Sequence, residues 1–86
     1  MANTRSQIKR NRQAAMRHQR NKAVRSAVKT RMKRFDRAVA EGDRAGAEAA
    51  YGVAAGALDR AANRHVVHRN YAANHKSAMA RRLSGL

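Results

Sequence analysis

A helical pattern of apolar positions runs through the first half of the chain. Apolar side chains recur at spacings of four, four, three and four residues, at Val24, Val28, Met32, Phe35 and Val39. These spacings place the side chains on one face of an α-helix. Gly42 is a natural residue to end that helix. We therefore predict a helix that starts near Thr4 or Ser6 and runs to about Glu41.

The apolar stripe does not continue toward the N-terminus. Steps of three or four residues back from Val24 reach Arg20 or Asn21, and then Arg17. The segment still contains good helix formers and no proline. We predict that residues 4–23 continue the helix beyond the core. Because a helix that is polar all round is rarely stable by itself, we expect this part to be frayed until a partner binds.

Two further helices are predicted after Gly42. Asp43 is suited to cap the second helix. The apolar stripe of this helix is Ala47, Ala50, Tyr51, Ala54, Leu58 and Ala61. After a break near residues 64–67, a third helix has an apolar face of Ala72, His75, Met79 and Leu83. Short connections make consecutive helices antiparallel neighbours.

The expected fold is therefore all-α, in one domain of residues 1–86. Residues 24–86 are expected to form a three-helix bundle. The long, basic first helix is expected to extend beyond that bundle over residues 1–23.

Gly52 and Gly56 lie one turn apart on the second helix and allow two interpretations. Without a Cβ atom at either position, a neighbouring helix could approach closely. Alternatively, both are ordinary glycines tolerated in a helix that its neighbours stabilise, each at a cost of about 1 kcal/mol. The sequence leaves both interpretations open.

The distribution of charge along the chain indicates more about the partner of this protein than any single residue does. The net charge is +15. Residues 1–35 contain 12 lysines or arginines and no acid, and residues 60–86 contain six and no acid. All five acids lie in residues 36–59, with only two bases. Like charges at this density oppose a compact state, and a polyanionic partner would relieve them.

The composition also limits where the protein acts. No stretch approaches the roughly 20 apolar residues that span a bilayer, and the first residues lack the apolar segment of a secretory signal. There is no cysteine, which excludes disulfides and thiolate metal ligands. We expect a cytoplasmic protein that does not associate with membranes.

Three of the four histidines lie in residues 64–83 and raise the question of a metal site. His65 and His68 have a spacing at which two ligands can meet one ion. No cysteine or acid lies nearby to complete the site, and His75 is about 10 Å farther along a helix than His68. We therefore expect no metal and no other cofactor.

Catalytic residues are not expected either. General acid–base catalysis needs a titratable group tuned by burial or by a charged neighbour. The nearest serine–histidine pair is Ser77 and His75, which face different sides of a helix. No glycine-rich phosphate loop is present. We expect neither an enzyme nor a small-molecule substrate.

The basic segments instead favour binding to nucleic acid. Their lysines and arginines are interleaved with Asn, Gln, Ser and Thr, which bond to phosphate and ribose oxygens. Only three aromatic residues are present, so base-by-base reading of a single strand is not favoured. Structured RNA recognised by its shape and backbone fits better.

Two other functions fit less well. A nucleoid-type DNA-binding protein shares the charge and is the main alternative. A membrane-active peptide needs a large apolar face opposite its bases, and residues 4–23 have none.

The sequence also resembles a known family. The start "MANTRSQIKRNRQAAMRHQRNKAVRSAVKTRMKRF", the "EGD" turn and the end "VVHRNYAANHKSAMARRL" are similar to the bacterial small-subunit ribosomal protein twenty family. The most specific C-terminal matches are His68, Arg69, Asn70, Ala72, Ala73, Lys76 and Ser77. The N-terminal matches are Arg20, Asn21, Lys22, Ser26 and Thr30.

This resemblance implies a three-helix protein with an extended first helix, present as a monomer within the cytoplasmic ribosome. It implies direct binding to several helices of small-subunit ribosomal RNA, few protein contacts, and a role in folding the body of the subunit. The basic pattern and the resemblance together predict these RNA-binding residues: Lys9, Arg10, Arg12, Arg17, Arg20, Asn21, Lys22, Arg25, Ser26, Lys29, His68, Arg69, Asn70, Lys76, Ser77 and Arg81.

The chain departs from the family pattern at three positions. Glycine is usual where His65 stands, before the third helix. Histidine adopts a left-handed backbone conformation less readily than glycine does. A base is frequent where Tyr71 and Ala78 stand. We expect fewer phosphate contacts there, or a tyrosine that stacks on a sugar or a base.

Overall fold

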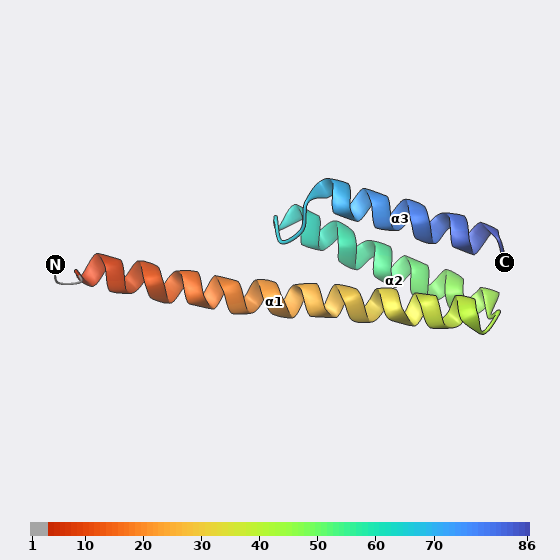
Figure 1. Ribbon diagram of the computed structural model, residues 1–86, viewed down its shortest axis with the longest axis horizontal. Coiled ribbons are helices and arrows are strands. Elements are labelled where there is room, and N and C mark those ends of the chain that lie inside the picture. The colour runs from red at the N-terminus through yellow and green to blue at the C-terminus, as the bar shows by residue number, and fades with distance from the viewer. Residues whose placement is uncertain (1–3) are drawn as a thin grey trace.

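The chain folds into three α-helices and an extended shape. The computed structural model describes residues 4–86, and the first residues of the expected extension, 1–3, lie outside this range. The helices are α1 (Arg5–Ala40), α2 (Arg44–Asn63) and α3 (Arg69–Ser84). They are antiparallel neighbours, and α2 lies between the other two (Figure 1). The molecule measures 61 × 20 × 16 Å. The all-α fold with a long first helix is as predicted.

The start of α1 is fixed by a reciprocal pair of hydrogen bonds. The main-chain N–H of Gln7 donates to the Thr4 hydroxyl at 3.2 Å, and the main-chain N–H of Thr4 donates to the Gln7 side chain at 3.3 Å. This capping box satisfies two donors that the first helical turn would otherwise leave unpaired. The helix therefore begins where the sequence predicts.

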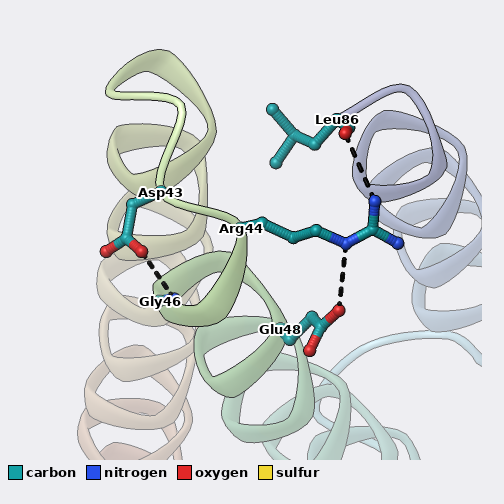
Figure 2. A network of polar contacts seen from close by, with 5 residues as sticks. All are labelled: Asp43, Arg44, Gly46, Glu48 and Leu86. Carbon is teal, nitrogen blue, oxygen red and sulfur yellow. Dashed lines mark hydrogen bonds and ion pairs between the residues drawn. The ribbon is translucent and has the colours of Figure 1, made fainter.

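A left-handed glycine ends α1. Gly42 has φ 70°. Its N–H donates to the Val39 carbonyl, and the N–H of Asp43 donates to the Ala38 carbonyl, both at 3.0 Å. This Schellman motif reverses the chain. The Asp43 carboxylate then accepts from the N–H of Gly46 at 2.9 Å and caps α2 (Figure 2). Both residues have the roles that the sequence predicts.

The same motif ends α2, but with histidine in the glycine position. His65 is the one non-glycine residue with a positive φ, 58°, among residues 4–86. Its N–H donates to the Ala62 carbonyl at 3.0 Å, and the N–H of Val66 donates to the Ala61 carbonyl at 2.9 Å. This is the position at which the resembled family usually has glycine, which adopts the left-handed conformation more readily.

The core lies where the apolar stripes of the three helices meet. Phe35 and Leu58 are its largest fully buried side chains. The ring of Phe35 meets the ring of Tyr51 edge-on, with centroids 6.2 Å apart. The other buried members are Val28, Ala54, Ala57, Ala61, Val66, Ala72 and Met79. In contrast, every residue from 4 to 20 is exposed. The N-terminal half of α1 projects past α2 and α3 (Figure 1).

Gly52 and Gly56 do not mediate a close helix–helix approach. A Cβ atom added at Gly52 would meet no heavy atom within 4 Å. At Gly56 it would meet only the Arg60 guanidinium on the same helix, at 3.3 Å. The close-approach interpretation is therefore wrong, because both glycines face away from the neighbouring helices.

Polar contacts join the helices around this core. Arg82 of α3 pairs with Asp36 of α1, and the Arg82 guanidinium carbon lies 5.7 Å from the centre of the Phe35 ring. Arg44, at the start of α2, donates to Glu48 and to the main-chain oxygen of Leu86, both at 3.3 Å (Figure 2). The segment after α3 is thus held against the start of α2.

Candidate nucleic-acid interface

The core-facing side of α1 changes from apolar to polar where the helix leaves the bundle. Val28 is buried and Val24 is partly buried. Asn21 and Arg17 continue the same face at spacings of three and four residues. Arg17 is exposed because no helix covers this part of α1. The projecting half therefore presents polar groups on the same face of α1 that packs against α2 within the bundle.

The other bases of the projecting half lie on several sides of the helix, and only Arg10 shares the face of Arg17. All of them are exposed, and they are Arg5, Lys9, Arg10, Arg12, Arg20 and Lys22. At 100° per residue they surround the helix rather than forming one stripe. A rod with positive charge on every side is suited to contact more than one polyanionic segment at once.

The connection between α2 and α3 meets α1 where the projection begins. Arg25 donates from Nε and Nη2 to the Val66 carbonyl, at 3.4 and 3.3 Å. The connection also carries Arg64, His65 and His68, all exposed. This connection lies beside the point where α1 projects from the bundle (Figure 1). Arg25, Arg64 and the bases of the projection give this region a positive charge.

His68 caps α3 with its side chain. The main-chain N–H of Asn70 donates to Nδ1 of the imidazole at 3.0 Å. One of the donors at the helix start is therefore already satisfied. Arg69 and the Asn70 side chain remain exposed beside it.

The predicted RNA-binding residues of α3 do not share one surface. Asn70, Ser77 and Arg81 follow spacings of seven and four residues and form an exposed stripe on the side away from the core. Lys76 lies on the flank toward α2, where its ammonium pairs with Asp59 at 2.7 Å. The hydrogen bond to Asp59 raises the pKa of Lys76 above its ordinary value.

Besides His68, which caps its own helix, two of the predicted RNA-binding residues make side-chain contacts between elements of the fold. Arg25 holds the connection before α3, and Lys76 holds α3 against α2. Other residues are brought together: Arg25, Lys29 and His68 line one hollow of about 380 Å³ with Val28, Val66, Val67 and Tyr71. No sequence pattern predicts that Val66, Val67 and Tyr71 share a site, although Tyr71 stands out as a departure from the family.

All five acidic residues have a partner within the fold. Within residues 4–86, four acids form ion pairs: Asp36 with Arg82, Glu41 with Arg37, Glu48 with Arg44, and Asp59 with Lys76. The fifth acid, Asp43, caps α2. Ion pairs at a surface stabilise little, typically below about 1 kcal/mol. Their consequence here is electrostatic, because they leave the bases of α1 upstream of Asp36 without acidic partners.

The described residues offer little support for other kinds of site. No group of three or more His, Cys, Asp or Glu side chains lies within metal-binding reach of one another in residues 4–86. No helix in that range combines the length and apolar character needed to cross a membrane.

Comparison with known proteins identifies the family. The family model for ribosomal protein S20 matches residues 2–84. The chain belongs to the ribosomal protein S20 family. It is 49% identical to the small ribosomal subunit protein bS20 of a Nocardioides species, over the full length of both chains. It is also 50% identical, again over both full lengths, to the protein of that name from Bifidobacterium longum subsp. infantis.

A third relative, the small ribosomal subunit protein bS20 of Corynebacterium diphtheriae, is 51% identical over 98% of this chain and 97% of its own. Membership confirms the resemblance seen in the sequence. It does not assign roles to individual residues, so the candidate interface rests on the exposure, charge and placement described above.

Proposed function

We propose that this protein is a structural component of the small ribosomal subunit that binds small-subunit ribosomal RNA directly. The projecting half of α1 lies among RNA helices, and the exposed side of α3 lies against RNA as well. The protein acts as a monomer with few protein contacts, within cytoplasmic ribosomes. By bridging several RNA segments, it stabilises the folded body of the subunit during assembly.

One observation carries this proposal: the acids have partners within the fold, while the bases of the projecting helix are exposed and have no acidic partner among residues 4–86. Residues 4–20 are all exposed, so they gain no stability from burial against the rest of the fold. A polyanion on several sides provides the compensating interaction. No step in this function requires covalent chemistry.

The bundle and the projecting half of α1 have different roles in this mechanism. The bundle fixes the direction of α1 through Phe35 and Leu58, which are fully buried. The projecting half then carries its charges into RNA as a rod about 1.5 Å long per residue. Because double-helical RNA repels its neighbours, a cationic rod between RNA segments lowers the free energy of their close packing.

The proposal is tested by measuring affinity for small-subunit ribosomal RNA as a function of salt. The logarithm of the binding constant should fall against the logarithm of salt with a slope of about −6 or steeper, if about eight bases contact phosphates. The double substitution Arg17→Gln and Arg20→Gln should make the slope shallower by about 1.5. A slope shallower than about −2 for the wild type contradicts the proposal.

A matched control removes the same number of charges elsewhere. Arg37→Gln and Arg60→Gln change two exposed bases, one near the end of α1 and one in the last turn of α2, away from the projecting half of α1. This variant should keep the wild-type slope to within about 0.5. If both double variants change the slope equally, the projecting half of α1 has no special role.

A further inference from the structure

The hollow beside Arg25 has a size and wall suited to a small planar ligand group. It lies between α1, the α2–α3 connection and the first turn of α3, and encloses about 380 Å³. Val28, Val66, Val67 and Tyr71 provide its apolar wall. This volume lies in the range of sites that hold small molecules, roughly 300–1,000 Å³. A single nucleobase has this combination of apolar faces and limited size.

The rim of the hollow is positive because Arg25 and Lys29 of α1 line it, and both are exposed. No acid lines the hollow. Arg25 uses Nε and Nη2 to bond the Val66 carbonyl, and its Nη1 makes no hydrogen bond within residues 4–86. An apolar wall with a cationic rim matches a nucleotide, in which a base with apolar faces is linked to a phosphate.

Tyr71 is the aromatic residue that this surface offers. Phe35 and Tyr51 pack against each other in the core. The ring of Tyr71 lies against the imidazole of His75, with centroids 4.2 Å apart and planes inclined at 48°. That contact restricts the tyrosine ring before any ligand binds. Unpaired bases in RNA are commonly held by stacking on such rings.

We propose that this hollow holds one unpaired nucleobase of the bound RNA, against Tyr71, with an adjoining phosphate beside Arg25 and Lys29. The inference rests on the proposed RNA-binding function and adds a single-nucleotide site to it. An apolar side chain from a protein would fill the wall but leave the cationic rim without a partner. A purely electrostatic RNA contact would use the rim and leave the apolar wall exposed.

The first test uses the full wild-type chain bound to small-subunit ribosomal RNA. Ultraviolet irradiation, which joins a base to a side chain in direct contact, is followed by mass spectrometry of the linked peptides. The expected result is a nucleotide attached within residues 66–71. Links confined to α1, with none at residues 66–71, overturn the proposal. If no complex forms at all, the proposed function fails instead, so the two outcomes are distinct.

The second test compares substitutions at Tyr71. Tyr71→Phe keeps the ring and should bind RNA as the wild type does. Tyr71→Ala should lower affinity about tenfold, the scale of one lost base stack, with an unchanged salt slope. Val53→Ala is the control, because Val53 is an apolar side chain on α2 that is 52% exposed. It should leave affinity unchanged.

A charged variant keeps the test decisive even if Tyr71→Ala disturbs folding. Tyr71→Lys introduces the basic character frequent in the family, and its long stem can follow the helix surface. It should abolish the link at residues 66–71 while making the salt slope steeper by about 0.7–0.9. If Tyr71→Lys retains the link, or if Tyr71→Phe loses affinity as strongly as a folded Tyr71→Ala, stacking on Tyr71 is refuted.

Discussion

Arg25 donates two hydrogen bonds to the main-chain carbonyl of Val66, from Nε at 3.4 Å and from Nη2 at 3.3 Å. These bonds join α1, at the point where it leaves the bundle, to the connection between α2 and α3. Arg25, which was predicted to bind RNA, is thereby also part of the scaffold that fixes the direction of the projecting helix. Arg25 therefore links the stability of the bundle to the geometry of the candidate interface.

Removal of this side chain should cost stability in the absence of RNA. Arg25→Ala leaves the Val66 carbonyl without its donors and should lower the free energy of unfolding by about 1 kcal/mol. Lys29→Ala is the matched control, because Lys29 lines the same rim and its side chain forms no ion pair within residues 4–86. Its effect should stay within about 0.5 kcal/mol. Urea unfolding monitored by circular dichroism measures both, and equal losses would contradict the structural role of Arg25.

The histidine at the end of α2 should be replaceable to the benefit of the fold. His65 holds a left-handed conformation at φ 58°, which disfavours residues with a Cβ atom. His65→Gly should raise the free energy of unfolding by about 1 kcal/mol. The reciprocal change, Gly42→Ala at φ 70°, should lower it by a similar amount. Destabilisation by His65→Gly would show that the imidazole makes a contact that offsets the backbone strain.

The ion pair between Lys76 and Asp59 should give stability a dependence on alkaline pH. The hydrogen bond to Asp59 is the largest cause of the raised pKa of Lys76; partial burial opposes it and the attraction of the two charges adds to it. A pKa raised by folding means that the stabilisation is fully present below the ordinary value of 10.5. It is lost as pH rises through the folded-state pKa.

The wild type and Asp59→Asn should therefore be compared from about pH 8 to about pH 12. Their difference in free energy of unfolding should be constant at first and shrink above the ordinary lysine pKa. Glu48→Gln provides the control, because its partner Arg44 stays charged over this range. A difference for Asp59→Asn that stays flat across the range would refute the assignment.

The two halves of α1 should differ in protection from hydrogen exchange when RNA is absent. Val28 is buried under α2, whereas Ala15 lies in the exposed projection. Amide protons near Ala15 should exchange quickly because that part of the helix has no tertiary contacts to prevent opening. Those near Val28 should exchange only with opening of the bundle. Equal protection at the two positions would show that the projection is stable by itself.

Local patterns predicted the elements of this fold well. The apolar spacing from Val24 to Val39 marks the covered part of α1, and Gly42 and Asp43 mark the turn that follows. These features depend on residues a few positions apart, so periodicity and turn chemistry suffice to find them. At the end of α2, the family pattern rather than local spacing singled out His65, which the structure shows in the left-handed conformation.

Contacts between distant residues were beyond the reach of those patterns. Arg25 and Val66 are 41 positions apart, and Lys76 and Asp59 are 17 apart. No spacing rule connects such pairs, so Arg25 and Lys76 were predicted only as RNA-binding residues. The same limit explains the two glycines of α2, because the side of the helix that is covered depends on where α1 and α3 lie. The hollow beside Tyr71 likewise requires three elements that only the tertiary fold brings together.

The central claim is that this charged surface recognises structured ribosomal RNA and not any polyanion. A competition assay between small-subunit ribosomal RNA and duplex DNA, at near-physiological salt, tests it most directly. The wild type should prefer the RNA by more than about tenfold. Asn70→Ala should reduce that preference, because its exposed amide can both donate to and accept from a ribose hydroxyl. Lys22→Ala should weaken both interactions alike. Equal affinity of the wild type for the two nucleic acids would contradict the account and favour a DNA-binding protein.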